Sequence, residues 1–241
     1  MQKFRSFIFF IGWNLNGLII LPIFILMSAI GGIKFRRKLM PYWCKFSLWW
    51  LKVSCNVHYK IEGLENLSTL KTQPSLVLSK HQSTFETFFL AMILPPHVFV
   101  LKRELLWIPI FGWILWLMQA IAINRSEGSK SFKKLIRASK AKLSEGVSVV
   151  MFPEGTRVKL GDSSQYKMGA FRLATMLKVP ILPISHNAGH AWAKGQFVKN
   201  AGTIRVVIGA PILTDGVKAE ALMETTKTWM ETYANKPLEA V

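Results

Sequence analysis

A histidine and a glutamate stand five positions apart in the stretch SLVLSKHQSTFETFFLAMIL, which runs from Ser75 to Leu94. His81 follows an apolar run, so we expect it at the end of a strand, on the carboxyl edge of a sheet where α/β proteins place their sites. A carboxylate at Glu86, one helical turn later, can hydrogen-bond one ring nitrogen and leave the other to accept a proton. This pattern indicates the base and the orienter of a proton-transfer site whose nucleophile comes from the substrate.

The same residues also fit a structural role. Ser83-Thr84-Phe85-Glu86 matches a capping box, with Ser83 as the N-cap and Glu86 as the third helical residue. In this interpretation Glu86 starts a helix and has no part in proton transfer. Both interpretations stay open on these residues alone. The replacement Glu86→Gln would distinguish the two interpretations. Glutamine also completes the capping box, but it has no charge with which to stabilise a protonated His81.

A second polar stretch, VVMFPEGTRV, runs from Val149 to Val158. It begins like a buried strand and continues into Pro-Glu-Gly-Thr-Arg. Gly155 would let the backbone approach a ligand closely, and Arg157 can bind a phosphate through a forked pair of hydrogen bonds. Alone, the stretch also fits a turn with a surface salt bridge.

Strand-like and helix-like patterns alternate through residues 57–241, which predicts an α/β domain with a mixed sheet flanked by helices. Strands are expected over 58–62, 75–78, 98–101, 120–123, 147–152, 181–185 and 204–208. Helices are expected over 84–93, 130–144, 169–177 and 218–234. Residues 1–56 are expected to form a separate N-terminal membrane-anchoring helical region.

The composition points to a membrane partner. The 241 residues are 51% hydrophobic and carry a formal net charge of +18. Such a chain suits an anionic membrane surface, a nucleic acid or an acidic partner. The aromatic and aliphatic residues gathered near the N-terminus favour the membrane, and no nucleic-acid-binding motif is present. Cys44 and Cys55 are too few for a disulfide framework.

No charged residue occurs from Phe7 to Ile33, a stretch long enough for a helix to cross a bilayer. It is long for a cleaved signal peptide, and a basic cluster follows it where a cleavage site would stand. The excess of Lys and Arg after this segment predicts that the rest of the chain lies on the cytoplasmic face of the inner (plasma) membrane. Asn14, Asn16 and Pro22 weaken a simple span, and the segment could pair with the aromatic stretch 40–57 and dip into one leaflet.

The stretch from Glu104 to Met118 is apolar all round and is broken by Pro109 and Gly112. It fits either a buried helical corner or a surface that meets lipid or an acyl chain, and its three tryptophans favour the surface.

The remaining histidines carry little functional signal. His186 and His190 have the spacing of a helical metal pair, but they follow a strand and enclose a glycine, so no metal site is expected. His58 and His97 are interpreted as structural.

Four ordered blocks between residues 75 and 190 resemble the glycerolipid acyltransferase family and, within it, the lysophosphatidate (1-acylglycerol-3-phosphate) acyltransferases. The first block of that family usually reads N-H-x-x-x-x-D, where this chain has Lys80, His81 and Glu86. Glutamate keeps the carboxylate and lengthens its arm by one methylene. The third block, FPEGTR from Phe152 to Arg157, matches in full.

The second and fourth blocks are less complete. LKRELLWIPIFGW supplies Lys102, Arg103, Pro109 and Gly112 of the second block, whereas AIAINR supplies Arg125 without the usual glycine and aromatic before it. The lysine and glycine downstream of the third block match Lys167 and Gly169. The fourth block, V-P-I-x-P-[VI], runs from Val179 to Ile184 and includes Pro183.

The resemblance implies acyl transfer from a thioester, acyl-coenzyme A or acyl carrier protein, to the sn-2 hydroxyl of lysophosphatidate, which makes phosphatidate in phospholipid biosynthesis. His81 would be the base and Glu86 its orienter. The oxyanion would meet backbone N–H groups near Gly155. The substrate phosphate would be bound by Arg157, with Lys102, Arg103 and Arg125 as helpers. The residues that support these motifs would be Glu154, Gly155, Thr156, Lys167 and Pro183.

No cofactor and no metal are required by this chemistry, and the expected partners are membrane lipids, lysophosphatidate and the acyl donor. An acyltransferase with another acceptor, such as glycerol-3-phosphate or another lysolipid, is the first alternative. A non-catalytic membrane-bound lipid-binding protein is the second, and it predicts that His81→Ala leaves function intact. A basic nucleic-acid-binding protein is a remote third, which the apolar N-terminus opposes.

Overall fold

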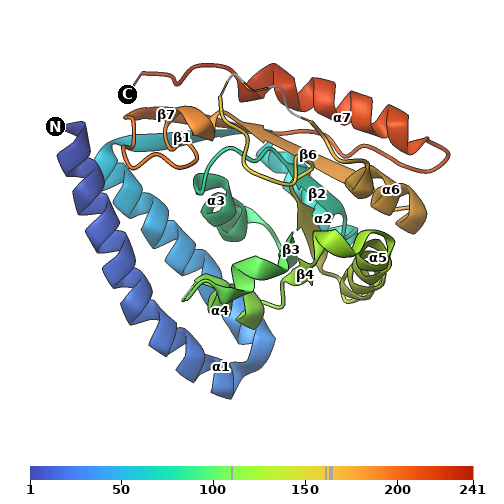
Figure 1. Ribbon diagram of the computed structural model, residues 1–241, viewed down its shortest axis with the longest axis horizontal. Coiled ribbons are helices and arrows are strands. Elements are labelled where there is room, and N and C mark those ends of the chain that lie inside the picture. Colours follow the sequence, from blue (N-terminus) through green and yellow to red (C-terminus); the bar gives the residue numbers. More distant parts are fainter. Residues whose placement is uncertain (110, 161, 163–164, 241) are drawn as a thin grey trace.

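The computed structural model describes residues 1–109, 111–160, 162 and 165–240. Within them, a seven-stranded sheet has the order β1-β7-β6-β2-β5-β3-β4 (Figure 1). Only β6 and β7 pair antiparallel among these neighbours, so the predicted mixed sheet is confirmed. The strands are β1 (Val57–Glu62), β2 (Leu76–Ser79), β3 (His97–Lys102), β4 (Ile121–Ile123), β5 (Ser148–Met151), β6 (Ile181–His186) and β7 (Gly202–Ile208).

Helices cover both faces of the sheet, because buried strand residues alternate between two cores. Val77 belongs to the core shared with α1 and α3, whereas its neighbours Leu76 and Leu78 belong to the core shared with α5, α6 and α7. The helices after α1 are α2 (Thr69–Thr72), α3 (Phe85–Ile93), α4 (Phe111–Leu117), α5 (Gly128–Ser144), α6 (Met168–Leu177) and α7 (Ala219–Ala234). Short 3₁₀ helices are η1 (Leu64–Ser68), η2 (Arg103–Trp107), η3 (Arg125–Glu127) and η4 (Ala188–His190).

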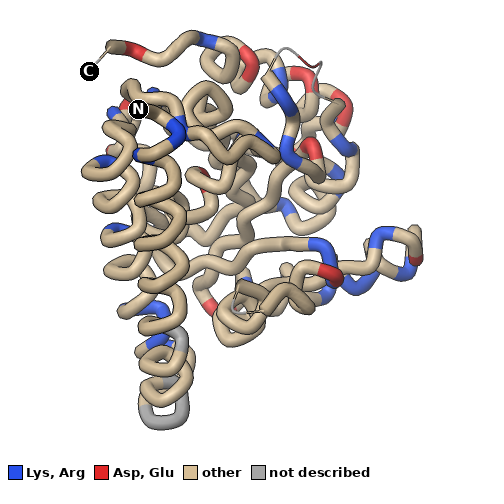
Figure 2. The backbone as a smooth tube through the Cα atoms, turned by 60° about the vertical axis from the view of Figure 1, so that its left-hand side comes forward, with Lys and Arg blue, Asp and Glu red and all other residues tan. Residues whose placement is uncertain are grey.

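The N-terminal helix α1 (Gln2–Cys55) is a hairpin of two antiparallel arms (Figures 1 and 2). Its helical geometry breaks at Gly32, whose φ of 61° and ψ of −165° are conformations that glycine adopts readily. Hydrogen bonds then tie the beginning of the first arm to the end of the second, as from Arg5 Nε to Ser54 O at 2.8 Å. The structure therefore contains the helical pair, although residues 2–27 are apolar and long enough to cross a bilayer by themselves.

Both arms of the hairpin pack on the face of the sheet that α3 also covers. Phe88 of α3 lies between Trp13 of the first arm and Trp43 of the second, with ring centroids at 5.6 and 5.4 Å. Trp43 is held in turn by a hydrogen bond from its Nε1 to Asn16 Oδ1 at 2.6 Å. Asn16, which weakens a membrane span, thus has a partner inside the hairpin. Residues of both arms share one hydrophobic core with the sheet.

Candidate active site

His81 lies where the sequence pattern predicts, just beyond the carboxyl end of β2. This strand lies between β5 and β6, near the middle of the sheet. The backbone hydrogen bond from Lys80 N to Ile184 O continues the pairing with β6 for one more residue, after which the chain turns toward α3. A residue placed there is rigidly held by two neighbouring strands, and ligands of α/β proteins bind at this edge.

Glu86 contacts His81 directly. Its Oε1 lies 2.8 Å from His81 Nδ1 and also accepts hydrogen bonds from the backbone N–H groups of Gln82 (3.0 Å) and Ser83 (2.8 Å). Burial alone would raise the pKa of this fully buried carboxyl, but the neighbouring His186 and His81 side chains and the backbone N–H of Ser83 outweigh burial and lower it. An ionised Glu86 fixes the Nδ1–H tautomer of His81 and leaves Nε2 as the proton acceptor.

The structure is compatible with both interpretations of Glu86, because one oxygen makes the contacts that each of them requires. The helix begins one residue later than the predicted box, at Phe85 with Thr84 as N-cap. The Ser83 hydroxyl nevertheless accepts from Phe85 N at 3.1 Å, which is the hydrogen bond expected of an N-cap side chain. Glu86 still reaches back to Ser83 N, as in a capping box.

His186, the last residue of β6, supports this pair from behind. It is buried, its Nε2 lies 3.0 Å from Lys80 O, and its Nδ1 accepts from Ala188 N at 3.2 Å. These contacts define a neutral ring, in agreement with burial, which lowers the pKa of His186. Its Nε2 is 3.9 Å from Glu86 Oε2, close enough to limit how that carboxylate can rotate. No pattern in the sequence indicated this contact.

The stretch around Arg157 forms the other side of the site. Gly155 has a φ of 72°, and a Cβ placed there would lie 2.7 Å from Arg125 Nη1, which donates to Gly155 O. The loop is tied to the histidine turn by Val158 N, which donates to His81 O at 2.8 Å. Arg157 Nη1 donates to Thr84 Oγ1 at 3.0 Å. Two motifs far apart in sequence thus become one unit around His81.

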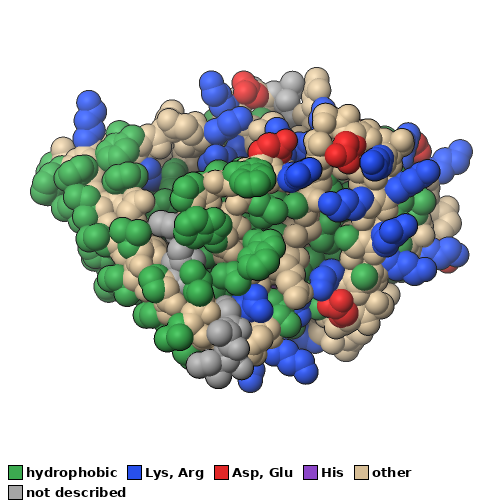
Figure 3. All heavy atoms as spheres, turned by 60° about the horizontal axis from the view of Figure 1, so that its bottom comes forward, with side chains coloured by type: hydrophobic (Ala, Val, Ile, Leu, Met, Phe, Trp, Pro, Cys, Tyr) green, Lys and Arg blue, Asp and Glu red, His purple; other side chains and the backbone are tan. Residues whose placement is uncertain are grey.

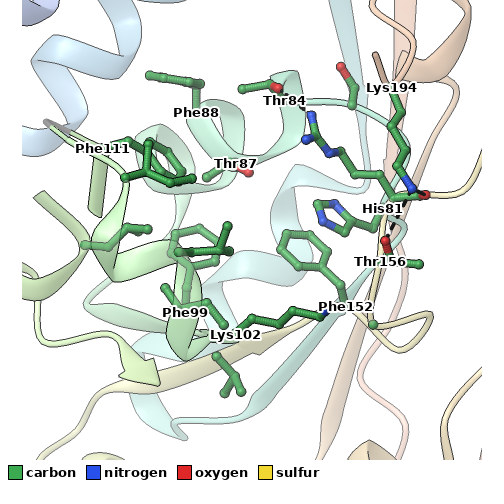
Figure 4. A pocket seen from close by; sticks show the side chains of 18 of the residues that line it. His81, Thr84, Thr87, Phe88, Phe99, Lys102, Phe111, Phe152, Thr156 and Lys194 are labelled. Atoms are coloured by element: carbon green, nitrogen blue, oxygen red, sulfur yellow. Dashed lines mark hydrogen bonds between the residues drawn. The ribbon is translucent and has the colours of Figure 1, made fainter. Parts of the chain in front are cut away.

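These groups line a cavity of about 640 Å³ that is polar at one end and apolar at the other (Figure 4). His81 stacks on Phe152, with ring centroids 3.9 Å apart. The cations of the lining are Lys102, Arg125, Arg157 and Lys194. The apolar lining includes Trp13, Trp43, Phe88, Phe99, Leu105 and Phe111. A ligand with an anionic group and a hydrocarbon chain fits this division, with its reacting atom near His81.

Comparisons with known proteins identify the family. The acyltransferase family model matches residues 58–187, which contain His81, Glu86 and Arg157. A 1-acyl-sn-glycerol-3-phosphate acyltransferase of Pseudomonas aeruginosa is 42% identical over 188 residues, covering 78% of this chain and 72% of that one. The chain belongs to the acyltransferase family.

Two further relatives show how far the likeness extends. A chloroplastic 1-acyl-sn-glycerol-3-phosphate acyltransferase of Brassica napus is 32% identical over 80% of this chain, which spans only 56% of that protein. The crystal structure of the 1-acyl-sn-glycerophosphate acyltransferase PlsC from Thermotoga maritima superposes with a TM-score of 0.80 at 22% identity. That match covers 96% of this chain and 95% of the other, so the fold is shared over nearly the whole length.

This acyltransferase has a buried ion network directly behind its histidine turn. Lys80 Nζ lies 3.3 Å from Glu154 Oε1 and also pairs with Glu231 of α7, to which Tyr166 donates at 3.2 Å. Glu154 Oε1 in turn accepts from His81 N at 3.3 Å. Burial raises the pKa of Glu154 to about 7, against the lowering effect of Lys80. Glu154 thus supports the backbone at His81 and lies outside the cavity lining.

The other predicted residues of the acyltransferase lie in different places. Lys102 and Arg125 line the cavity, but Arg103 does not; it begins η2 and lines a separate groove. Thr156 lines the cavity and lies 3.4 Å from Lys194 Nζ. Lys167 is the N-cap of α6, and its backbone N–H donates to Pro153 O at 2.7 Å, while Pro183 lies inside β6.

Lys194 is a cation of the cavity lining that the sequence analysis did not predict. Lys194 follows η4 in a stretch without helix or strand, and its Nζ donates to Arg157 O at 2.9 Å. A lysine in such a stretch has no periodicity or motif that would distinguish it from a surface lysine. Only the fold places it beside Arg157.

Proposed function

We propose that this acyltransferase transfers an acyl group from a thioester, acyl-coenzyme A or acyl carrier protein, to the sn-2 hydroxyl of lysophosphatidate, giving phosphatidate. The observation that carries the proposal is the His81–Glu86 pair, whose histidine lines a cavity with walls that are cationic at one end and apolar at the other. The names of the relatives from Pseudomonas and Brassica support the same acceptor.

In the first step His81 Nε2 removes the proton of the sn-2 hydroxyl while that oxygen attacks the thioester carbonyl. The imidazolium that forms is stabilised by the ionised Glu86 carboxylate on Nδ1. The nucleophile belongs to the acceptor, so no acyl-enzyme forms.

In the second step the tetrahedral oxyanion collapses, the carbon–sulfur bond breaks, and the thiolate takes the proton from His81. Gly155 N already donates to Phe152 O at 2.9 Å, so the oxyanion donors assigned here are the backbone N–H groups that follow, of Thr156 and Arg157. Both residues line the cavity. In this scheme the proton passes from the acceptor hydroxyl to His81 and then to the thiolate, and neither step requires a cofactor.

The acceptor phosphate would bind Arg157, with Lys102, Arg125 and Lys194 around it. The apolar walls, which include Trp13, Trp43 and Phe88, suit a hydrocarbon chain of the acyl donor or of a lysolipid acceptor. The names of the relatives favour the lysolipid over glycerol-3-phosphate. We assign the α1 hairpin to one leaflet, at the cytoplasmic face of the inner membrane. Its two ends return to the catalytic domain, and basic residues follow its first arm.

Purified protein in detergent, assayed by mass spectrometry, tests this function. Lysophosphatidate, glycerol-3-phosphate and a neutral lysolipid would each be paired with acyl-coenzyme A and with acyl carrier protein. We expect phosphatidate from wild type and none from His81→Ala. His190→Ala is the matched control, since His190 does not line the cavity. Equal product from His81→Ala would contradict the assigned base, and product only from another acceptor would contradict the substrate.

A further inference from the structure

The residues on either side of His81 both contact the last turn of α7. Lys80 Nζ pairs with the Glu231 carboxylate, and Gln82 Nε2 donates to Ala234 O at 3.1 Å. Lys80 is still paired with β6, and successive side chains of an extended chain point to opposite sides. The two contacts with α7 therefore direct the side chain between them, that of His81, away from this helix and into the cavity.

The contacts of Lys80 and Gln82 are shielded from water. The two residues are 1% and 2% exposed, and a buried ammonium is stable only when it is paired. Gln82 is held at both ends of its amide, because its Oε1 accepts from Gly189 N at 3.2 Å. Its acceptor on α7, Ala234 O, is the last carbonyl of the helix and has no partner within it. Water competes poorly for such bonds, so they hold the turn in one position.

Glu231 stands where a carboxylate does not favour a helix. It lies in the last turn of α7, where the negative end of the helix dipole disfavours an anion. Its neighbours compensate, because Lys80 supplies a cation and Tyr166 donates to the same oxygen at 3.2 Å. Ser185 of β6 also donates to this turn, at Met230 O. The position of Glu231 is therefore explained by its contact with Lys80 and not by the stability of α7.

A second link leads from the ammonium of Lys80 to the backbone of His81. Glu154 Oε1 lies 3.3 Å from Lys80 Nζ and accepts from His81 N at 3.3 Å. Movement of Lys80 would thus displace both the residue before the base and the carboxylate that holds the N–H of the base. The family's first block usually has asparagine where this chain has Lys80, and the family model ends at residue 187, before α7. Neither pattern assigns α7 a part in catalysis.

We propose that the last turn of α7 is a clamp that positions His81 for proton transfer. Glu231 acts through Lys80, and Ala234 O acts through Gln82. None of these four residues lines the cavity, so they are positioning residues that touch neither the substrate nor the transferred acyl group. Misplacement of a reacting group by about 1 Å can lower a rate about 100-fold, so contacts of this kind can control kcat.

The clamp is remote from the apolar face of the molecule. Trp107, Trp113 and Trp116 are exposed and line one groove with Ile25 of α1, which excludes the buried corner considered for residues 104–118. Figure 3 shows apolar side chains gathered on this side of the molecule. In Figure 1, α7 lies on the opposite side from α4. Substitutions in α7 therefore leave the apolar face unchanged, and a change in rate reports on the catalytic turn.

Steady-state kinetics of the full chain in detergent test the clamp, and this test rests on the proposed function. For Glu231→Ala we expect kcat to fall about tenfold or more, with KM for lysophosphatidate changed less than about twofold. Glu231→Gln keeps an oxygen that accepts from Lys80 and should retain kcat to within about threefold. Glu224→Ala is the matched control, because Glu224 is exposed on the same helix, and it should change neither constant.

Two kinetic results would overturn the proposal. One is a kcat for Glu231→Ala within about twofold of wild type. The other is an equal loss in the alanine and glutamine variants, since the hydrogen bond to Lys80 would then have no effect. A purely structural role would lower the thermal midpoint and leave kcat of the folded protein unchanged, so thermal denaturation is followed on the same samples.

Hydrogen exchange measured by mass spectrometry tests the clamp without any activity. Peptides that contain residues 80–86 should exchange about tenfold faster in Glu231→Ala than in wild type, because the turn opens more often. Peptides from β7 should exchange alike in both proteins. Unchanged exchange at the turn, or an equal increase in β7, would overturn the clamp. If wild type acylates no acceptor, the proposed function fails, while hydrogen exchange still decides the clamp.

Discussion

Replacement of Glu86 by glutamine removes a charge while keeping a side chain of the same shape. In the wild type, Glu86 Oε1 accepts from His81 Nδ1 and from the backbone N–H groups of Gln82 and Ser83. The amide oxygen of glutamine can keep the two backbone hydrogen bonds. The contact with His81 changes in kind, because a neutral amide does not stabilise an imidazolium and its N–H₂ group can favour the wrong tautomer.

The expected effects differ sharply in size. In hydrolase triads, the same change in the orienting carboxylate lowers kcat about 10⁴-fold; we expect about 10³–10⁴ here, equivalent to about 4–5 kcal/mol of transition-state stabilisation. The loss in free energy of unfolding should be only about 1–2 kcal/mol, because two charge-assisted hydrogen bonds become neutral ones. The thermal midpoint should then fall by only a few degrees.

Initial rates of acyl transfer by mass spectrometry and thermal denaturation followed by circular dichroism measure the two effects on one preparation. Glu224→Gln is the matched control, as Glu224 is exposed on α7. A Glu86→Gln protein with full turnover would refute the orienting role and leave only the helix cap. A protein that loses turnover together with its folded structure would refute the assumption that glutamine keeps the backbone hydrogen bonds.

Three further predictions concern the cations and the buried network. In steady-state assays, Arg157→Ala should raise KM for a phosphate-bearing acceptor about 10- to 100-fold, with a smaller change in kcat. Lys159→Ala is the control and should change neither constant, because Lys159 is exposed and lies outside the cavity lining. Lys80→Met leaves the buried Glu154 carboxylate without its cation, so the free energy of unfolding should fall by about 3–5 kcal/mol in chemical denaturation. A change below about 1 kcal/mol would show that the ion pair is dispensable for stability. Because the pKa of Glu154 is raised from 4.5 to about 7, the folded chain keeps a proton that the unfolded chain releases. The free energy of unfolding should therefore fall as pH rises through this interval, by at most about 3 kcal/mol, and Glu154→Gln should remove that dependence in denaturation series at pH 5 and pH 8.

Local patterns determined most of the secondary structure. Apolar runs such as 75–78 and 204–208 became central strands with ends shifted by one or two residues, and 130–144 became most of α5. The hairpin could not be decided from sequence, because its turn depends on the backbone of Gly32 and on contacts such as that between Arg5 and Ser54. A hydropathy pattern contains neither.

The candidate site was predictable to the extent that its chemistry is local. His81 and Glu86 are one helical turn apart, so their contact follows from a strand end and a helix start. Lys194 and Glu231 reach the site from distant parts of the chain, and only the sheet order brings them there. Arg103 is the converse case. Its motif predicts a place in the site, but Arg103 begins η2 and lines a separate groove outside the cavity.

The pairing of β1 with β7 has a consequence for how the protein is made. β1 directly follows the hairpin, and its first residue, Val57, pairs with Gly202, near the other end of the chain. A ribosome therefore releases the membrane-seeking hairpin and β1 long before the partner strand exists. During that interval the edge of β1 offers unpaired backbone groups to any neighbouring strand. Insertion of the hairpin into a membrane would hold that edge at the bilayer surface, one chain at a time, until β7 is synthesised.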